Sequence, residues 1–126
     1  AKLTGIGGVL FRSRHPKGLS DWYRDQLGIE PDDDGVVQTW WREAKALIAG
    51  HTVWALFSAD TEYFGPTSNQ FMVNYRVDDL DEMLQELEAA SVEIVPKREN
   101  SEFGRFASIV DPEGNRIELW EPPERQ

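Results

Sequence analysis

The sequence of 126 residues predicts an α+β fold built from two tandem strand–helix–strands modules in one chain. Two observations predict this fold. An alternating strand pattern followed by an amphipathic helix pattern opens the chain, and the same order begins again at residue 71. A connector rich in turn-forming residues, 58–69, separates the two patterns. We therefore expect one domain over residues 1–126, with internal repeats at about 1–60 and 68–122.

The first repeat begins with a strand and a helix. Residues Gly5–Ser13 alternate with a period of two, which is typical of a strand. Pro16 suits the first position of a helix, with His15 before it, and Gly28 suits a left-handed cap at its end. The apolar stripe between these signals has helical spacing: Leu19, Trp22, Tyr23 and Leu27.

Two further strands complete the first repeat. They are predicted over Val36–Trp41 and Thr52–Phe57, with a loop near Gly50 between them. The acidic run Asp32–Gly35 is interpreted as a solvated turn, because it lacks the alternating ligands of a calcium loop. Whether Ile29–Pro31 adds a short extra strand is left open.

The second repeat follows the same plan. Phe71–Val77 alternates as a strand, and Asp79 is an acidic cap for the helix that follows. The helical stripe comprises Leu80, Leu84, Leu87 and Ser91. Three strands are predicted after it, with a proline- and glycine-containing turn before the last: Val92–Val95, Gly104–Val110 and Arg116–Trp120.

The two faces of the predicted sheet differ in chemistry. The face under the helices has these candidates: Val9, Phe11, Phe71, Val73, Tyr75, Val77, Ile117 and Leu119. The opposite positions mix polar and large apolar residues: Gly8, Leu10, Arg12, Met72, Asn74, Arg76, Arg116, Glu118 and Trp120. A solvent face seldom holds methionine and tryptophan among its charges, whereas a curved sheet around a cleft has apolar walls with a few polar groups. Arg12 and Arg76 occupy equivalent repeat positions, so they can face one another across such a cleft.

Composition excludes several classes of function. The chain has no cysteine, which excludes disulfides, thiolate zinc sites and a cysteine nucleophile. Its net charge of −10 disfavours binding to nucleic acid or to anionic membranes. No apolar run approaches the roughly 20 residues that span a bilayer, and residues 1–8 lack the features of a signal peptide. We therefore expect a cytoplasmic protein.

Three segments resemble a known superfamily. They are Trp22–Gly28, Val77–Asp81 and Asp111–Pro122, the last with the pattern DPxGNxxEL. Together they are similar to the vicinal oxygen chelate superfamily, which includes glyoxalases, bleomycin-resistance proteins and extradiol dioxygenases. The resemblance implies two βαβββ modules that form a cleft-shaped mixed sheet, in a homodimer.

The resemblance also implies where metal ligands would lie. The first-strand ligand positions fall at Gly8 and Met72, and the last strand of the first module offers Trp54 or a neighbour. None of these supplies the oxygen or imidazole donor that such a divalent ion needs. Only Glu118 matches a ligand position, and a catalytic divalent ion normally has about three protein ligands. We therefore predict no cofactor.

The leading hypothesis is a metal-independent small-molecule-binding protein. Its expected ligand-contacting residues are Arg12, Trp54, Met72, Asn74, Arg76, Glu118 and Trp120. The acidic surface would attract a cationic drug, as in a drug-sequestering protein. The alternative is a metal-dependent glyoxalase-like lyase, isomerase or dioxygenase. A third possibility is metal-free acid–base catalysis with Glu118 as the catalytic residue, because burial beside tryptophan would raise its pKa.

Other interpretations of these residues stay open. Glu118 is otherwise a surface glutamate or an ion-pair partner of Arg76, and the two arginines otherwise form cross-strand ion pairs. His15 and His51 are interpreted as a helix-start and a hairpin residue. Trp40 and Trp41 point to opposite faces, one to the core and one to the cleft or a dimer contact. The segment Tyr63–Gly65 is a packed connector or an aromatic lid.

Overall fold

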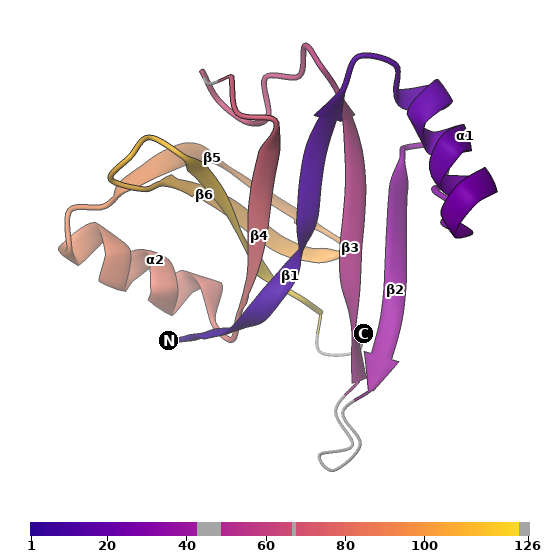
Figure 1. Cartoon of the computed structure of the whole chain (residues 1–126). Coiled ribbons are helices and arrows are strands. Elements are labelled where there is room, and N and C mark those ends of the chain that lie inside the picture. The colour runs from indigo at the N-terminus through magenta and orange to yellow at the C-terminus, as the bar shows by residue number, and fades with distance from the viewer. Residues whose placement is uncertain (43–48, 67, 124–126) are drawn as a thin grey trace. The chain divides into compact units, whose positions relative to one another are not determined.

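The computed structural model describes residues 1–42, 49–66 and 68–123, with only the backbone given for 38–42 and 49–51. These residues form two helices and seven strands (Figure 1). They divide into two compact units. Unit 1 comprises residues 1–7 and 72–126, and unit 2 comprises residues 8–71. The expected α+β class is confirmed.

Unit 2 contains a three-stranded mixed arrangement in the order β2–β3–β1. Strand β1 (Leu3–Ser13) enters this unit at Gly8 and pairs in parallel with β3 (Ala49–Ser58). Strand β2 (Val36–Arg42) pairs with β3 in antiparallel fashion. Residues 29–31 are not a strand, so the optional extra strand of the first repeat is absent.

Helix α1 (Pro16–Leu27) connects β1 to β2 and has the predicted boundaries. Proline occupies its first turn, while the N–H of His15 donates to Ser13 Oγ at 3.0 Å. Gly28 adopts φ 70°, and its N–H donates to the carbonyl of Arg24 at 3.1 Å. Glycine adopts this left-handed conformation without the steric cost that a Cβ atom imposes, so Gly28 is suited to end the helix.

Unit 1 contains the strand order β4–β7–β6–β5. Strands β4 (Phe71–Val77) and β7 (Arg116–Glu121) pair in parallel, and β6 (Gly104–Val110) pairs with both of its neighbours in antiparallel fashion. Strand β5 (Glu93–Ser101) is longer than predicted. Its second half is polar and contains Pro96, so it lacks the apolar alternation that marks a strand, and the pairing shifts register between Ile94 and Arg98.

Helix α2 (Leu80–Ala89) covers one face of unit 1. Asp79 caps it by accepting a hydrogen bond from the N–H of Glu82 at 3.0 Å, as predicted. The core under this helix is formed by side chains of α2 and of strands β4, β6 and β7: Val77, Leu80, Leu84, Ala107, Ile109 and Leu119. Tyr75 and Ile117 pack against this core, so the odd positions of β4 and β7 lie on the predicted face.

Phe71 was expected on the sheet face under the helices, and its side chain is more exposed than the residues expected there in unit 1. Its side chain is 60% exposed and stacks on Phe11 of unit 2, with the ring centroids 5.8 Å apart. Phe71 is the first residue of β4, where the strand emerges from the connector, so alternation along the strand does not place it under α2.

In the residues described, neither helix has the length and apolarity that crossing a membrane requires.

Candidate functional site

The even positions of β4 and β7 lie on the face of unit 1 opposite α2. Asn74 pairs with Glu118 and Arg76 pairs with Trp120 in the parallel register. Met72 precedes Asn74 by two residues and therefore shares this face. All five side chains are buried: Met72, Asn74, Arg76, Glu118 and Trp120. Five of the seven residues predicted to contact a ligand are thus brought together within one unit.

The centre of this face is the Asn74–Glu118 pair. The Nδ2 of Asn74 donates to Oε1 of Glu118 at 2.6 Å, and the two residues are 2% and 5% exposed. Burial raises the pKa of Glu118 from 4.5 to about 8. Ser108 of β6, also buried, lies opposite Glu118 on its other side. A carboxyl group with a pKa near neutrality can act either as a proton donor or as a proton acceptor.

Trp120 forms a fixed wall of the site. Its indole N–H donates to the carbonyl of Phe103 at 2.8 Å, and its ring stacks on Phe106 with 6.0 Å between centroids. The guanidinium of Arg76 lies over the indole, with Cζ 5.6 Å from the ring centroid. Burial lowers the pKa of Arg76, because the charged form is partly removed from water.

A hollow of about 600 Å³ in unit 1 reaches this face at Arg76. Its volume lies within the usual range for small-molecule sites. Arg105 on its wall is already engaged, since it contacts Asp81 at 2.7 Å and Glu121 at 3.8 Å. The other lining residues include Thr4, Asp78, Asp79, Pro122 and Pro123.

Gly7 was not recognised as a site residue from the sequence. A Cβ atom at this position would overlap Asn74 Oδ1 and would lie 2.8 Å from Cε3 of Trp120. The absence of a side chain at Gly7 therefore makes room for two site residues. Paired glycines inside a strand are a signal of such a close approach, and Gly7–Gly8 carries that signal.

The structure corrects the predicted sheet face of Trp54 in unit 2. It was expected on the face of Arg12, but it lies opposite Val9 in the β1–β3 register. Its ring contacts Phe11 and Tyr23 edge-on, with centroids 5.1 Å apart in both pairs. Trp54 therefore belongs to the aromatic cluster under α1. The parallel register decides this, because it pairs Gly8 with Val53 and therefore Val9 with Trp54. A Cβ atom at Gly8 would overlap the Val53 carbonyl, so a glycine permits this close approach of the two strands.

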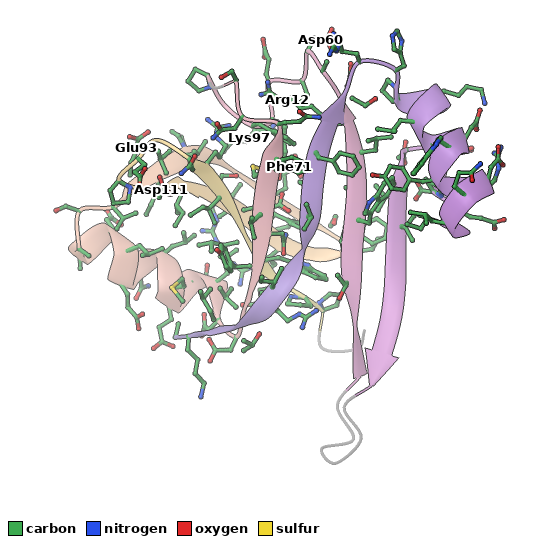
Figure 2. All side chains as sticks on the ribbon, viewed as in Figure 1. Arg12, Asp60, Phe71, Glu93, Lys97 and Asp111 are labelled. Carbon is green, nitrogen blue, oxygen red and sulfur yellow. The ribbon has the colours of Figure 1, made fainter. Side chains whose placement is uncertain are left out.

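Arg12 lies near the end of β1, on the face opposite Trp54 (Figure 2). Its guanidinium lies 4.9 Å from the centroid of Phe64, which is 1% exposed. Phe57 stacks on Tyr63 with centroids 5.5 Å apart and also contacts Phe64. These contacts and the burial of Phe64 indicate that Tyr63–Gly65 is a packed connector.

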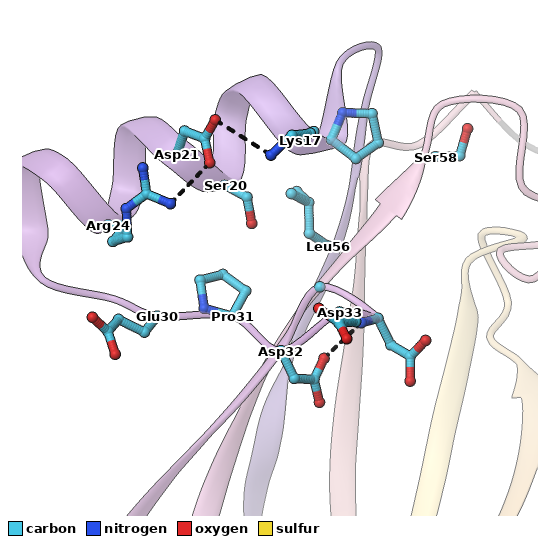
Figure 3. A pocket seen from close by; sticks show the side chains of 13 residues that line it. Lys17, Ser20, Asp21, Arg24, Glu30, Pro31, Asp32, Asp33, Leu56 and Ser58 are labelled. Carbon is cyan, nitrogen blue, oxygen red and sulfur yellow. Dashed lines mark hydrogen bonds and ion pairs between the residues drawn. The ribbon is translucent and has the colours of Figure 1, made fainter.

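Unit 2 has a larger hollow of about 690 Å³ between α1 and the acidic turn (Figure 3). None of the predicted ligand-contacting residues lines it. Asp21 lies between Lys17 and Arg24, with ion pairs of 3.9 and 3.1 Å. The Asp32 carboxylate accepts hydrogen bonds from the backbone of Asp34 and Val36. These contacts support the interpretation of Asp32–Gly35 as a turn.

The donor set does not fit a divalent metal ion. Within the described ranges, no group of three histidine, cysteine, aspartate or glutamate side chains is placed to bind one ion. Gly8 has no side chain, Met72 offers only a soft thioether, and Glu118 is bonded to an amide. His15 is exposed before α1, and the side chains of His51, Trp40 and Trp41 lie outside the described residues.

Comparisons with known proteins agree on the fold. The model of the Glyoxalase/Bleomycin resistance protein/Dioxygenase superfamily matches residues 5–119. No curated protein sequence matches significantly. Methylmalonyl-CoA epimerase from Mycobacterium tuberculosis is similar in structure, with a TM-score of 0.61, 22% identity and coverage of 98% of this chain and 91% of that one.

Two further solved structures share the fold. A methylmalonyl-CoA epimerase variant from Streptomyces coelicolor, in complex with 2-nitronate-propionyl-CoA, has a TM-score of 0.67 and 14% identity, covering 98% and 97% of the two chains. A Legionella pneumophila protein described as NAD-dependent benzaldehyde dehydrogenase has a TM-score of 0.58 and 16% identity, covering 92% and 98%. Likeness at these identities is evidence of the fold alone.

Proposed function

Because the chain belongs to the Glyoxalase/Bleomycin resistance protein/Dioxygenase superfamily, we propose that it binds a small molecule on the Asn74–Glu118 face of unit 1 without a metal ion. One observation carries the proposal. A hydrogen-bonded amide–carboxyl pair is buried between the apolar side chains of that face. Burying such polar groups costs stability, so their retention at one place favours a role in recognition.

The chemistry of the face indicates what the ligand offers. Met72 and Trp120 supply apolar contact, while Asn74 and Glu118 orient a polar group. The lining of the hollow at Arg76 includes four carboxylates, Asp78, Asp79, Asp81 and Glu121, and two arginines. Together with the net charge of −10, this favours a ligand that also carries a cationic group.

Calorimetric titration tests the proposal directly. The ligands are a cationic glycopeptide of the bleomycin type, small carboxylates and an acyl-CoA thioester, each with excess EDTA. We expect saturable binding of one class by the unmodified protein, weakened at least about tenfold by Asn74→Ala. Gln85→Ala, on the exposed face of α2, is the matched control and leaves binding unchanged. Absence of binding by every class, with no shift in thermal stability, contradicts the proposal.

A second candidate function is proton transfer by Glu118. The raised pKa of this carboxyl, about 8, favours it, since a general acid or base works best when its pKa is near the operating pH. The likeness to methylmalonyl-CoA epimerases suggests acyl-CoA thioesters as first substrates. Exchange of a substrate C–H hydrogen with D₂O, abolished by Glu118→Gln, would support this function. Binding without exchange would exclude it for those thioesters.

The metal-dependent alternative has its own test. Elemental analysis of purified protein would find stoichiometric nickel, zinc or iron, and Glu118→Ala would remove it. Stoichiometric metal that is lost in Glu118→Ala would replace the metal-free proposal, whereas metal well below one equivalent would support the metal-free proposal.

Assembly and location are also part of the proposal. The superfamily resemblance supports a homodimer, and size-exclusion chromatography with light scattering tests it against a mass of 14.4 kDa for one chain. The proposed location is the cytoplasm, which cell fractionation tests.

A further inference from the structure

We propose that Asn74 is a positioning residue for the Glu118 carboxyl, and that the missing side chain of Gly7 is what allows Asn74 to hold it. This inference rests on the proposed function, because Glu118 lies in the proposed site. It assigns Asn74 a role toward Glu118 in addition to its proposed contact with a ligand.

The register makes the contact possible. Asn74 and Glu118 are direct partners in the parallel β4–β7 pair, so their side chains leave the sheet side by side. The contact between Nδ2 and Oε1, at 2.6 Å, is short for an N–H···O hydrogen bond. Both side chains are almost completely buried, so water does not compete for either partner.

Gly7 fixes the other end of the amide. Asn74 Oδ1 is buried and accepts no hydrogen bond from the described residues. It lies where a Cβ of residue 7 would be. Any larger residue at position 7 must therefore displace the amide, and with it the Nδ2 that donates to Glu118.

Three hydrogen bonds tie the start of β1 and the residue before it to the end of β4 and the residue after it. The N–H of Lys2 donates to Oδ1 of Asp78 at 3.0 Å, and the N–H of Asp78 donates to the carbonyl of Lys2 at 3.3 Å. Thr4 Oγ1 donates to the carbonyl of Arg76 at 3.4 Å. These hydrogen bonds at residues 2 and 4 oppose a shift of the nearby backbone at residue 7.

The groups around the pair are few. The other even positions of β4 and β7 carry the charged residues Arg76 and Arg116. Strand β6 contributes the uncharged Phe106 and Ser108 opposite β7, and β1 contributes Gly7. The amide is in direct contact with the carboxyl, and its removal changes the environment of the carboxyl without changing any charge.

The test measures the Glu118 carboxyl without any ligand. Carboxyl carbon shifts of ¹³C-labelled glutamate are followed by NMR against pH in the full chain. Asn74→Ala removes a donor to the ionised form, so the apparent pKa of Glu118 rises by about one unit. Gly7→Ala produces a rise in the same direction although Asn74 is still present. Met72→Leu, on the same buried face, is the control and leaves the apparent pKa unchanged.

The double variant distinguishes positioning from general packing. If Gly7 acts through Asn74, adding Gly7→Ala to Asn74→Ala gives no further shift. A further shift of similar size, or no shift in Gly7→Ala alone, overturns the inference. Where a variant does not fold, the side-chain amide signals of Asn74 in the unmodified protein decide, and they must titrate together with Glu118. Because no ligand is present, this test can fail while ligand binding succeeds, so failure of the inference and failure of the proposed function are distinguishable.

Discussion

Arg76 lies across the indole ring of Trp120 from the strand next to it, with Cζ 5.6 Å from the ring centroid. The two residues are direct partners in the β4–β7 register. Arg76 also lines the hollow of about 600 Å³, so it lies between the solvent-facing hollow and the buried wall of the site. A change at Arg76 is therefore expected to affect both packing and ligand entry.

Arg76→Lys tests this contact. Lysine keeps the charge but loses the planar guanidinium that lies over the indole, so the free energy of unfolding is expected to fall by about 1 kcal/mol. Urea denaturation at neutral pH measures the change. Arg24→Lys on α1, where the side chain is 48% exposed, is the control and is expected to change stability by less than about 0.5 kcal/mol. If the two substitutions lowered the free energy of unfolding equally, a stabilising contact between Arg76 and Trp120 would be contradicted.

Glu118→Gln is expected to remove a pH dependence of stability. The folded pKa of Glu118, about 8, lies above its ordinary value of 4.5. Below pH 4.5 the group is protonated in both states and costs nothing. As the pH rises from 4.5 to 8, the unfolded state releases the proton first, so the folded protein loses stability.

The two proteins should therefore diverge with pH. Glutamine keeps the shape and an acceptor for Asn74 but does not ionise, so the variant gains up to about 4 kcal/mol over the unmodified protein by pH 8. Near pH 4.5 the two should unfold at similar denaturant concentrations. Denaturation curves at four or five pH values make the comparison. Parallel pH profiles would show that the carboxyl is not desolvated in the folded state.

Asp81 is expected to act in the opposite direction. Hydrogen bonds from Arg105 and then Arg98 lower the pKa of Asp81 from 3.8 to about 2. Its contribution to stability is present above pH 3.8 and is lost as the pH falls toward 2. The stability difference between the unmodified protein and Asp81→Asn should therefore shrink between pH 4 and pH 2. It should also shrink in 1 M salt, since the group is exposed and screened. A difference independent of both variables would contradict the ion pairs.

Gly104 and Gly114 form a matched pair of substitutions. Both have positive φ, 120° and 86°. A Cβ at Gly104 would overlap the carbonyl of Glu121 and lie 2.8 Å from Nε1 of Trp120, whereas a Cβ at Gly114 meets nothing within 4 Å. Gly114→Ala is expected to cost about 1 kcal/mol for backbone strain, and Gly104→Ala clearly more. Thermal denaturation ranks the two, and the reverse order would contradict the packing of Trp120.

The site in unit 1 was predictable because strand periodicity is local. Met72, Asn74 and Arg76 alternate along one segment, and Glu118 and Trp120 along another, so a period of two assigns each set to a face. Which residue opposes which depends on the register between distant strands. One open interpretation paired Glu118 with Arg76, and the register of the two strands has Asn74 directly opposite Glu118.

The same limit explains the error at Trp54. Alternation within β3 separates Trp54 from its neighbours but does not say which set joins Arg12. The pairing of Gly8 with Val53 decides that, through a backbone approach that only a glycine permits. Strand β5 was underestimated for another reason. Its residues 96–101 are exposed and polar, so pairing with β6, rather than hydrophobic burial, defines this part of the strand.

Metal removal provides the last prediction. Hard divalent ions need several oxygen or imidazole donors, and the positions that the superfamily resemblance indicates carry Gly8, Met72 and Glu118. One carboxylate already bonded to Asn74 has little affinity for such an ion. We therefore expect EDTA treatment to leave the melting temperature unchanged, and added zinc or nickel to raise it no more than in Glu118→Gln. A ligand that binds only the folded state stabilises it by an amount that grows with the logarithm of its concentration over its dissociation constant, so metal in large excess reveals a specific site. A rise specific to the unmodified protein would mean that side chains beyond these three complete a metal site around Glu118.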